Sequence, residues 1–90
     1  MYSLEYSTQF KKDFKKITKM PISDIIEVGN FISKLQRGEK LDPKNVDHPL
    51  TGGWVGFRDC HVKPDLVLIY RIFDGQLQLA RIGSHSDLFC

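Results

Sequence analysis

The stretch WVGFRDCHVKPDLVLIYRIFDGQLQLARI, residues 54–82, decides the fold of this 90-residue chain. Its centre, Leu66–Phe73, is almost uninterrupted in apolar residues, a pattern typical of a strand that is buried on both faces. Turn signals flank this strand, Lys63-Pro64-Asp65 before it and Asp74-Gly75 after it. The stretch therefore predicts three consecutive antiparallel strands: Trp54–Val62, Leu66–Phe73 and Gln76–Ile82.

A strand and two helices are expected ahead of these three strands. Residues 1–6 alternate between apolar and polar side chains, as a short strand does, and a helix follows that is capped at residue 7 or 8 and ends near Lys19. A second helix is expected from residue 23 or 24 to Gly38. Its expected apolar side consists of Ile22, Ile25, Ile26, Ile32 and Leu35. Gly29 inside this helix predicts close packing, because glycine costs a helix about 1 kcal/mol relative to alanine. Residues 39–53 are expected to form a long ordered loop.

The order β-α-α-β-β-β places the whole chain, residues 1–90, in one α+β domain. We expect a mainly antiparallel sheet with the two helices packed as a hairpin on one face, which leaves the other face free for a site. A chain of 90 residues is too short for a second core, and this excludes a multidomain enzyme.

The apolar pattern also bears on the compartment in which the protein works. The longest run of large apolar residues, Leu66–Tyr70, is far shorter than the roughly 20 residues that cross a bilayer, and no apolar signal segment follows Met1. We therefore expect a cytoplasmic protein without a membrane partner. In a reducing compartment Cys60 and Cys90 are expected as free thiols, and they lack the paired spacing of a zinc site.

Charge is distributed unevenly along the chain. Residues 1–40 carry eight Lys and Arg against five Asp and Glu, whereas residues 41–90 carry five against six. The first predicted helix contains most of the lysines: Lys11, Lys12, Lys15, Lys16 and Lys19. Such a stripe is either a solvated helix face or a surface that faces phosphates or an acidic partner, and the pattern leaves both interpretations open.

Residues with acid-base chemistry gather in the second half of the chain. Antiparallel strands alternate in direction, so the turn after the first of the three strands and the end of the last strand lie at one end of the sheet. The residues expected to converge there are His61, Asp65, Arg81 and His85, and the long loop can deliver His48.

Such a set can cleave RNA without a metal or another cofactor. Attack by the ribose 2′-hydroxyl needs a base to remove its proton, a cation to stabilise the phosphorane, and an acid to protonate the departing 5′ oxygen. Histidine serves as base or acid and arginine binds phosphate oxygens, while Phe89, Phe57 or Trp54 can stack on bases. The alternative interpretation is structural, with Asp59 and Asp65 as ion-pair partners of the arginines. Metal ligation is disfavoured because no cluster of histidines fixes a geometry.

Three motifs together carry a specific resemblance. They are DHPLTGGW at residues 47–54, RDCHVKPD at residues 58–65 and RIGSHSDLF at residues 81–89. In this order they resemble the YafQ branch of the RelE superfamily of toxins, and the opening strand and basic helices are similar to the RelE-like plan in a looser way.

The resemblance implies a type II toxin that enters the ribosomal decoding site, cuts messenger RNA there and so inhibits translation. It also implies a cognate antitoxin that holds the toxin inactive, with operator DNA as a partner only through the antitoxin complex. The residues that carry over by position are His48, His61, Asp65, Arg81, His85 and Phe89.

We assign each of these residues a role as a hypothesis. His61, oriented by Asp65, is the general base, and His85 is the general acid. Arg81 stabilises the phosphorane, Phe89 stacks on a base, and His48 positions the substrate or acts as an alternative base. The lysine stripe, Lys11, Lys12, Lys15 and Lys16, would attract ribosomal RNA or an acidic antitoxin.

A non-enzymatic alternative keeps the same fold. A RelE/ParE-type protein can act by binding alone, either as a topoisomerase inhibitor or as a DNA-binding corepressor with its antitoxin. The three histidines at the expected positions disfavour the topoisomerase inhibitor. A decayed toxin that retains only antitoxin binding is disfavoured by the intact set of site residues.

Overall fold

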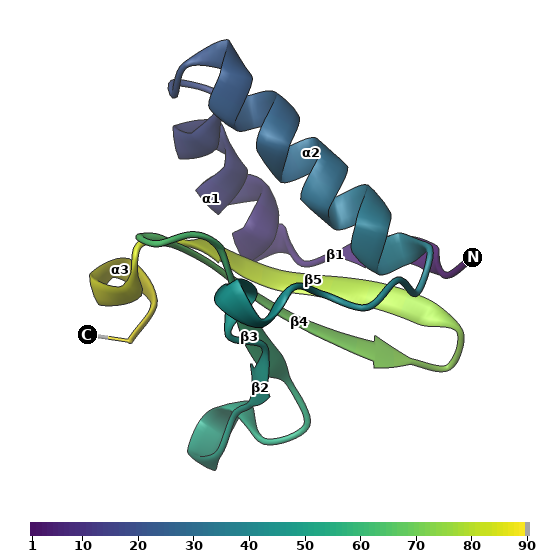
Figure 1. The fold of residues 1–90 in the computed structure, drawn as a ribbon. Helices are drawn as coiled ribbons and strands as arrows, with labels where there is room; N and C mark the ends of the chain where they lie inside the picture. The colour runs from purple at the N-terminus through teal and green to yellow at the C-terminus, as the bar shows by residue number, and fades with distance from the viewer. Residues whose placement is uncertain (90) are drawn as a thin grey trace.

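The computed structural model describes residues 1–89, and these form a five-stranded sheet that carries helices on both faces (Figure 1). The sheet has the order β1-β5-β4-β3-β2, in which β1 runs parallel to β5 and every other neighbouring pair is antiparallel. The helices and strands are β1 Ser3–Tyr6, α1 Thr8–Ile17, α2 Ile22–Gln36, β2 His48–Pro49, β3 Arg58–Lys63, β4 Leu66–Phe73, β5 Gln76–Gly83 and α3 His85–Phe89. The α+β class, the three antiparallel strands and the central position of β4 are confirmed.

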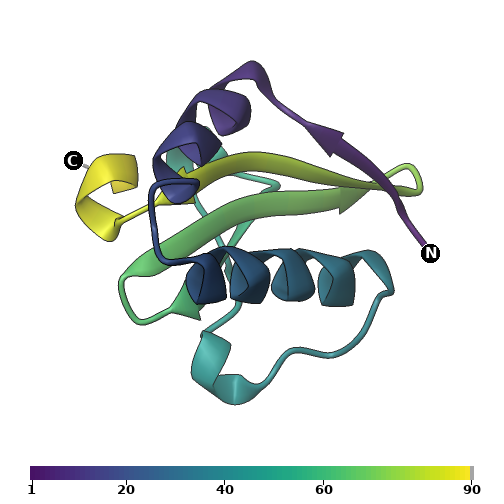
Figure 2. The same cartoon turned by 90° about the horizontal axis from the view of Figure 1, so that it is seen from above.

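Two apolar clusters pack on the two faces of the sheet. The first lies between the sheet and the helices α1 and α2, which both cover one face (Figure 2). The second surrounds Val67 and Ile69 of β4 and includes Leu88 of α3. Side chains from the loop before β3 complete this second cluster, among them Leu50, Trp54 and Phe57. The expectation of a free second face is therefore wrong for the half of the sheet next to α3, because the apolar side chains of β4 must be covered on both sides.

The segment between α2 and β3 is more structured than expected. It contains two short 3-10 helices, η1 Pro43–Asn45 and η2 Gly52–Trp54, with β2 between them. The strand predicted from Trp54 begins only at Arg58, because the Trp54 ring folds onto Phe57 with ring centroids 5.3 Å apart and joins the second cluster. The predicted tail after Gly83 instead forms α3, since Leu88 has an apolar surface to pack on.

The apolar face of α2 matches the expected one only in part. Leu35 is buried and Ile32 packs against the first cluster, as expected. Val28 is also buried, whereas Ile22 and Ile26 are 75% and 57% exposed. Seven residues separate Val28 from Leu35, about two helical turns, so these two define the side that meets the sheet. Gly29 is exposed, and a Cβ placed there would meet no atom within 4 Å. The expectation that Gly29 marks close packing is therefore wrong.

Two further expectations concern the turn before β5 and the thiols. Asp74 and Gly75 both have positive φ, at 52° and 73°, as a two-residue hairpin turn requires, and this confirms the predicted hairpin. Cys60 is a buried free thiol, and burial raises the pKa of this group well above its usual range. Cys90 lies outside the described residues. Within residues 1–89 no helix has both the length and the apolar character needed to cross a membrane.

Because Gly29 has open space around its Cα, a Gly29→Ala substitution should stabilise the protein. We expect the free energy of unfolding to rise by about 0.5–1 kcal/mol, since alanine loses less conformational entropy in a helix. Urea unfolding followed by circular dichroism measures this change. As a matched comparison, Gly75→Ala should destabilise the protein, because its φ of 73° is unfavourable for a residue with a Cβ. A destabilised Gly29→Ala variant would contradict the packing described for α2.

Candidate functional site

Strand register brings most of the predicted site residues into two adjacent rows on the second face of the sheet. In one row His48 of β2 lies opposite Asp59 of β3, Asp59 lies opposite Ile69, and Ile69 lies opposite Arg81 of β5. The next row begins with His61, which pairs with Val67, and Val67 in turn pairs with Gly83, two residues before His85. The backbone thus gathers all three histidines at one end of the sheet.

His48 rests against a buried carboxylate. Its Nε2 lies 2.7 Å from Oδ1 of Asp59, whose side chain is only 5% exposed, whereas the His48 side chain is 49% exposed. Asp59 Oδ1 is buried, and His48 is the group that lies against it, since no other hydrogen-bond partner of this oxygen occurs among the described residues. On the other side of the ring, Nδ1 lies 3.2 Å from the carbonyl oxygen of Pro49. Both ring nitrogens therefore face oxygen acceptors.

A second carboxylate fixes the loop that carries His48. Asp47 Oδ1 accepts a hydrogen bond from Nε of Arg58 at 2.6 Å, and its Oδ2 accepts one from the hydroxyl of Tyr70. Burial of the phenol and this hydrogen bond raise the pKa of Tyr70, and the ion pair raises the pKa of Arg58. The loop is also held by Asn45, whose Nδ2 donates to the carbonyl oxygen of His61 at 2.8 Å. The position of His48 is thus defined by contacts to β3 and β4.

His85 and Phe89 lie on α3, one helical turn apart. Their ring centroids are 4.8 Å apart at a tilt of 44°. Between these two residues in the sequence lies Leu88, whose side chain is buried. Helix α3 packs closely on the end of β5, because a Cβ at Gly83 would lie in van der Waals contact with Leu88, 3.4 Å from its Cδ2. Among the described residues the side chains of His85 and His61 form no hydrogen bond, which leaves their ring nitrogens available.

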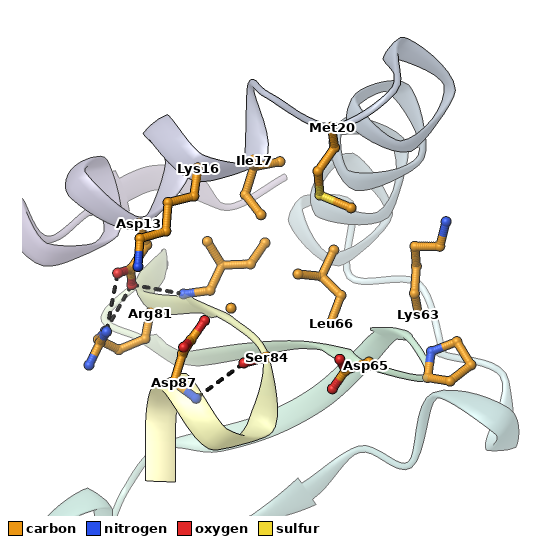
Figure 3. Close-up of a pocket in the computed structure, with 13 residues that line it drawn as sticks. Asp13, Lys16, Ile17, Met20, Lys63, Asp65, Leu66, Arg81, Ser84 and Asp87 are labelled. Carbon is orange, nitrogen blue, oxygen red and sulfur yellow. Dashed lines mark hydrogen bonds and ion pairs between the residues drawn. The ribbon is translucent and has the colours of Figure 1, made fainter. Parts of the chain in front are cut away.

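Arg81 is tied to helix α1 by Asp13 at the edge of a cleft of about 590 Å³ (Figure 3). The Nε and Nη2 atoms of Arg81 donate to the two carboxylate oxygens of Asp13 at 2.8 and 3.1 Å. Asp13 Oδ2 also accepts the backbone N–H of Ile82 at 3.2 Å. β1 ends at Tyr6, which pairs with Leu79, so this N–H lies on the part of β5 that pairs with no strand on that edge. Asp13 therefore has two roles: it accepts a backbone N–H at the open edge of the sheet, and it orients Arg81.

The ionisation of Asp13 reflects these contacts. Burial alone raises the pKa of this carboxyl, but hydrogen bonds from Arg81, Gln9 and the Ile82 amide outweigh burial, so the pKa of Asp13 is lowered overall. The same hydrogen bond from Asp13 raises the pKa of Arg81. Asp13 is thus a carboxylate at neutral pH and Arg81 a guanidinium cation.

Asp65 does not lie where sequence reasoning placed it relative to His61. Asp65 is exposed and lines the same cleft as Arg81, near Lys63 (Figure 3). His61 lines a separate pocket with Asn45 and Val46. No hydrogen bond joins Asp65 to His61 in the described part of the chain. Asp65 thus lines the cleft that Arg81 also lines, without contacting Arg81, and the carboxylate that lies against a histidine is Asp59 beside His48.

The lysine stripe is a solvent-exposed surface. Lys11, Lys12, Lys15 and Lys16 are all exposed on α1, and within residues 1–89 none of them makes an ion pair. Lys11 lies over the ring of Tyr6, with Nζ 5.6 Å from the centroid. Lys16 also lines the cleft that holds Arg81. The stripe and the cleft are therefore continuous.

Sequence reasoning missed two carboxylates that position site residues. The sequence contains a local signal for Asp59, because the two-residue period of the strand places it on the face of Phe57 and His61. It contains no signal that Asp13 pairs with Arg81, since Arg81 follows 68 positions later and Asp13 is only one acid among lysines. No group of three or more potential metal ligands occurs among residues 1–89.

Comparisons with known proteins give a consistent result over the whole chain. A family model described as a bacterial toxin of type II toxin-antitoxin system, YafQ, matches residues 2–90. The mRNA interferase toxin YafQ of Escherichia coli K12 is 39% identical over 87 residues, which cover 96% of this chain and 94% of that protein. The crystal structure of YafQ from E. coli BL21(DE3) superposes with a TM-score of 0.89 at 36% identity and covers both chains completely. The E. coli DinJ-YafQ complex contains a chain that matches with a TM-score of 0.84 at 35% identity, again over both chains completely.

Replacing Asp13 by asparagine should destabilise the protein in a pH-dependent way. At pH 7 we expect Asp13→Asn to lower the free energy of unfolding by about 1–3 kcal/mol, because Arg81 loses its charged acceptor. The folded pKa of Asp13 lies below the unfolded value of about 4, so its contribution is complete above that pH and is lost as pH falls through the folded pKa. Urea unfolding of both proteins at several pH values measures the difference.

The matched control is Glu27→Gln, which neutralises an exposed acid on α2 and should change stability by less than about 0.5 kcal/mol. A stability gap between wild type and Asp13→Asn that stayed constant from neutral pH down to strong acid would contradict the role of the carboxylate.

Proposed function

The chain belongs to the YafQ family of bacterial toxins of type II toxin-antitoxin systems, and from this membership we propose that it is an mRNA interferase, an endoribonuclease that cuts messenger RNA on the ribosome. The structural observation that supports the proposal most directly is the strand register. It sets His48, His61 and the segment leading to His85 at one end of the sheet, next to the strand that carries Arg81.

The proposed reaction uses the ribose 2′-hydroxyl as the nucleophile. A base takes the proton from this hydroxyl, O2′ attacks phosphorus, and the bond to the 5′ oxygen breaks as an acid supplies a proton to that oxygen. The products are a 2′,3′-cyclic phosphate and a 5′-hydroxyl. General acid-base catalysis contributes about 100- to 10,000-fold to such a step, and stabilisation of the charged phosphorane adds to it.

His61 and His85 suit the two proton-transfer roles. Neither ring is engaged in a hydrogen bond among the described residues, so either can accept or donate a proton. We assign His61 as the general base and His85 as the general acid. Phe89, whose ring lies against His85, would stack on a base next to the cleaved bond.

His48 and Arg81 suit the electrostatic roles. Both ring nitrogens of His48 face acceptors, so a protonated ring can donate on each side while Asp59 holds it in place. Arg81 keeps its Nη1 group free of Asp13 and can direct it to a phosphate oxygen. We therefore assign Arg81 to phosphorane stabilisation and His48 to positioning. Asp65 would orient His61 only if RNA binding draws the 63–65 turn toward it, as catalytic hydrogen bonds often tighten in the complex.

We infer the partners from the family and from the charge of α1. The DinJ-YafQ complex supports a cognate antitoxin for this chain, and operator DNA would be reached through that complex. The exposed lysine stripe suits either ribosomal RNA or an acidic antitoxin segment, because both carry negative charge. Messenger RNA would be presented by the ribosome, so weak activity on free RNA agrees with the proposal.

Replacing His85 by alanine should lower the rate of ribosome-dependent cleavage by about 100-fold or more, because the leaving oxygen loses its acid. Primer extension on programmed ribosomes measures the cuts, and circular dichroism checks the fold. Ser86→Ala, at the next exposed position of α3, is the matched control and should cleave like wild type. Unchanged cleavage by a folded His85→Ala variant would refute the acid role.

Neutralising the lysine stripe should weaken ribosome binding and its dependence on salt. We expect a variant with Lys11, Lys12, Lys15 and Lys16 all changed to glutamine to bind ribosomes less tightly at low salt and to show a flatter salt dependence. Co-sedimentation over a range of salt concentrations measures both quantities. A control with Lys34, Lys40 and Lys44 changed to glutamine removes charge outside α1. Equal weakening in the control would show that net charge, and not the stripe, sets the affinity.

A further inference from the structure

Arg71 stands apart from the other arginines of the chain. Three of the four arginines pair with a carboxylate: Arg37 with Glu39, Arg58 with Asp47 and Arg81 with Asp13. Arg71 instead donates its Nε–H to the uncharged amide oxygen of Gln78. Its positive charge is therefore not compensated by any acidic side chain of the described residues, and its Nη groups have no hydrogen-bond partner there.

Two aromatic rings hold the guanidinium group of Arg71. Its Cζ lies 5.0 Å from the ring centroid of Phe57 and 4.8 Å from that of Phe73, distances at which a cation is attracted to an aromatic face. Phe73 is 58% exposed, so much of its ring is open to solvent. We refer to Phe57, Arg71 and Phe73 as the arginine sandwich. It is a half-buried, preorganised cation with the exposed ring of Phe73 beside it.

The arginine sandwich lies on the same face of the sheet as the histidines. Side chains alternate along β4, so Arg71 and Phe73 follow Val67 and Ile69 on the second face. Val67 pairs with His61, and Arg71 is four residues further on, which places the sandwich about 13 Å along the strand from the His61 row. Gln78 and Gln76 of β5 lie opposite Arg71 and Phe73 and add amide groups to this surface. A short stretch of single-stranded RNA can therefore contact both regions.

We propose that the arginine sandwich is a binding site for single-stranded RNA beside the cleavage site, in which a base stacks on Phe73 and Arg71 contacts a phosphate. The inference rests on the proposed function, since it concerns the same RNA. Exposed aromatic faces next to arginine are the features by which proteins bind unpaired bases and their backbone, and side-chain amides can bond to base edges. An acidic protein segment would use the charge of Arg71 but would leave the exposed ring of Phe73 without a role.

The test is equilibrium binding of a 2′-O-methylated single-stranded RNA, which the protein cannot cleave, measured by fluorescence anisotropy. We expect Phe73→Ala and Arg71→Gln each to raise Kd by about tenfold, since stacking on one base is worth about 1–3 kcal/mol and 1.4 kcal/mol is tenfold. Both residues are at least partly exposed, so the fold should survive, and circular dichroism checks it.

Matched controls are Arg37→Gln, which removes an arginine at the C-cap of α2, and Ile72→Ala, which trims an exposed residue on the opposite face of β4. Both should bind RNA like wild type. Unchanged Kd in folded Phe73→Ala and Arg71→Gln variants would overturn the proposal. The same holds if RNA binding is unchanged while binding to a poly-glutamate peptide weakens, because the sandwich would then serve a protein partner.

Cleavage by the wild-type protein on programmed ribosomes is measured separately. If wild type binds RNA through the sandwich but makes no cuts, the proposed function fails and the binding site stands. If wild type cuts and the two variants both bind and cut normally, the proposed function stands and the binding site fails.

Discussion

The rest of the structure depends on the burial of one strand on both faces. Leu66–Tyr70 of β4 are all buried, and the fully buried Val67 and Ile69 point away from the helices that cover the other side. Burial of each such side chain is worth about 1.5–3 kcal/mol, so leaving them in water would be costly. The segments that cover them are α3 and the loop before β3. Those same segments carry His85 and His48, so the requirement to complete a core also positions two of the proposed site residues.

Three buried or partly buried carboxylates then set the orientation of the site. Asp13 holds Arg81, Asp47 holds Arg58 and Tyr70, and Asp59 lies against His48. Among residues 1–89 the buried Asp59 Oδ1 has no hydrogen-bond partner other than His48 Nε2, which lies 2.7 Å away. An unpaired buried oxygen costs about 1–3 kcal/mol, so Asp59 favours a position of the His48 ring against it. The geometry of Asp59 therefore agrees with a positioning role for this carboxylate.

Sequence reasoning succeeded where local pattern dictates structure and failed where distant contacts decide. The apolar run of β4, the Asp74-Gly75 turn and the alternation of Phe57, Asp59 and His61 are local, and all of them were predictable. The orientation of α2 depends on which residues meet the sheet, so its helical pattern alone misplaced Ile22 and Ile26. Similarly, α3 forms because Leu88 finds a cluster built by residues far away in the chain. For the site, residue identity pointed to the histidines and Arg81, but no local signal indicates that α1 supplies the partner of Arg81.

The parallel pairing of β1 with β5 has a consequence for synthesis of the protein. Residues 3–6 pair with residues 76–79, so the first strand made must wait for the last strand before it can join the sheet. Pairing between segments so distant in the chain is slow to form and contributes little until both are present. The edge contacts of Asp13 with Arg81 and Ile82 have the same requirement. A nascent chain therefore cannot complete this edge of the sheet, or the contact that orients Arg81, until residues 76–82 have been synthesised.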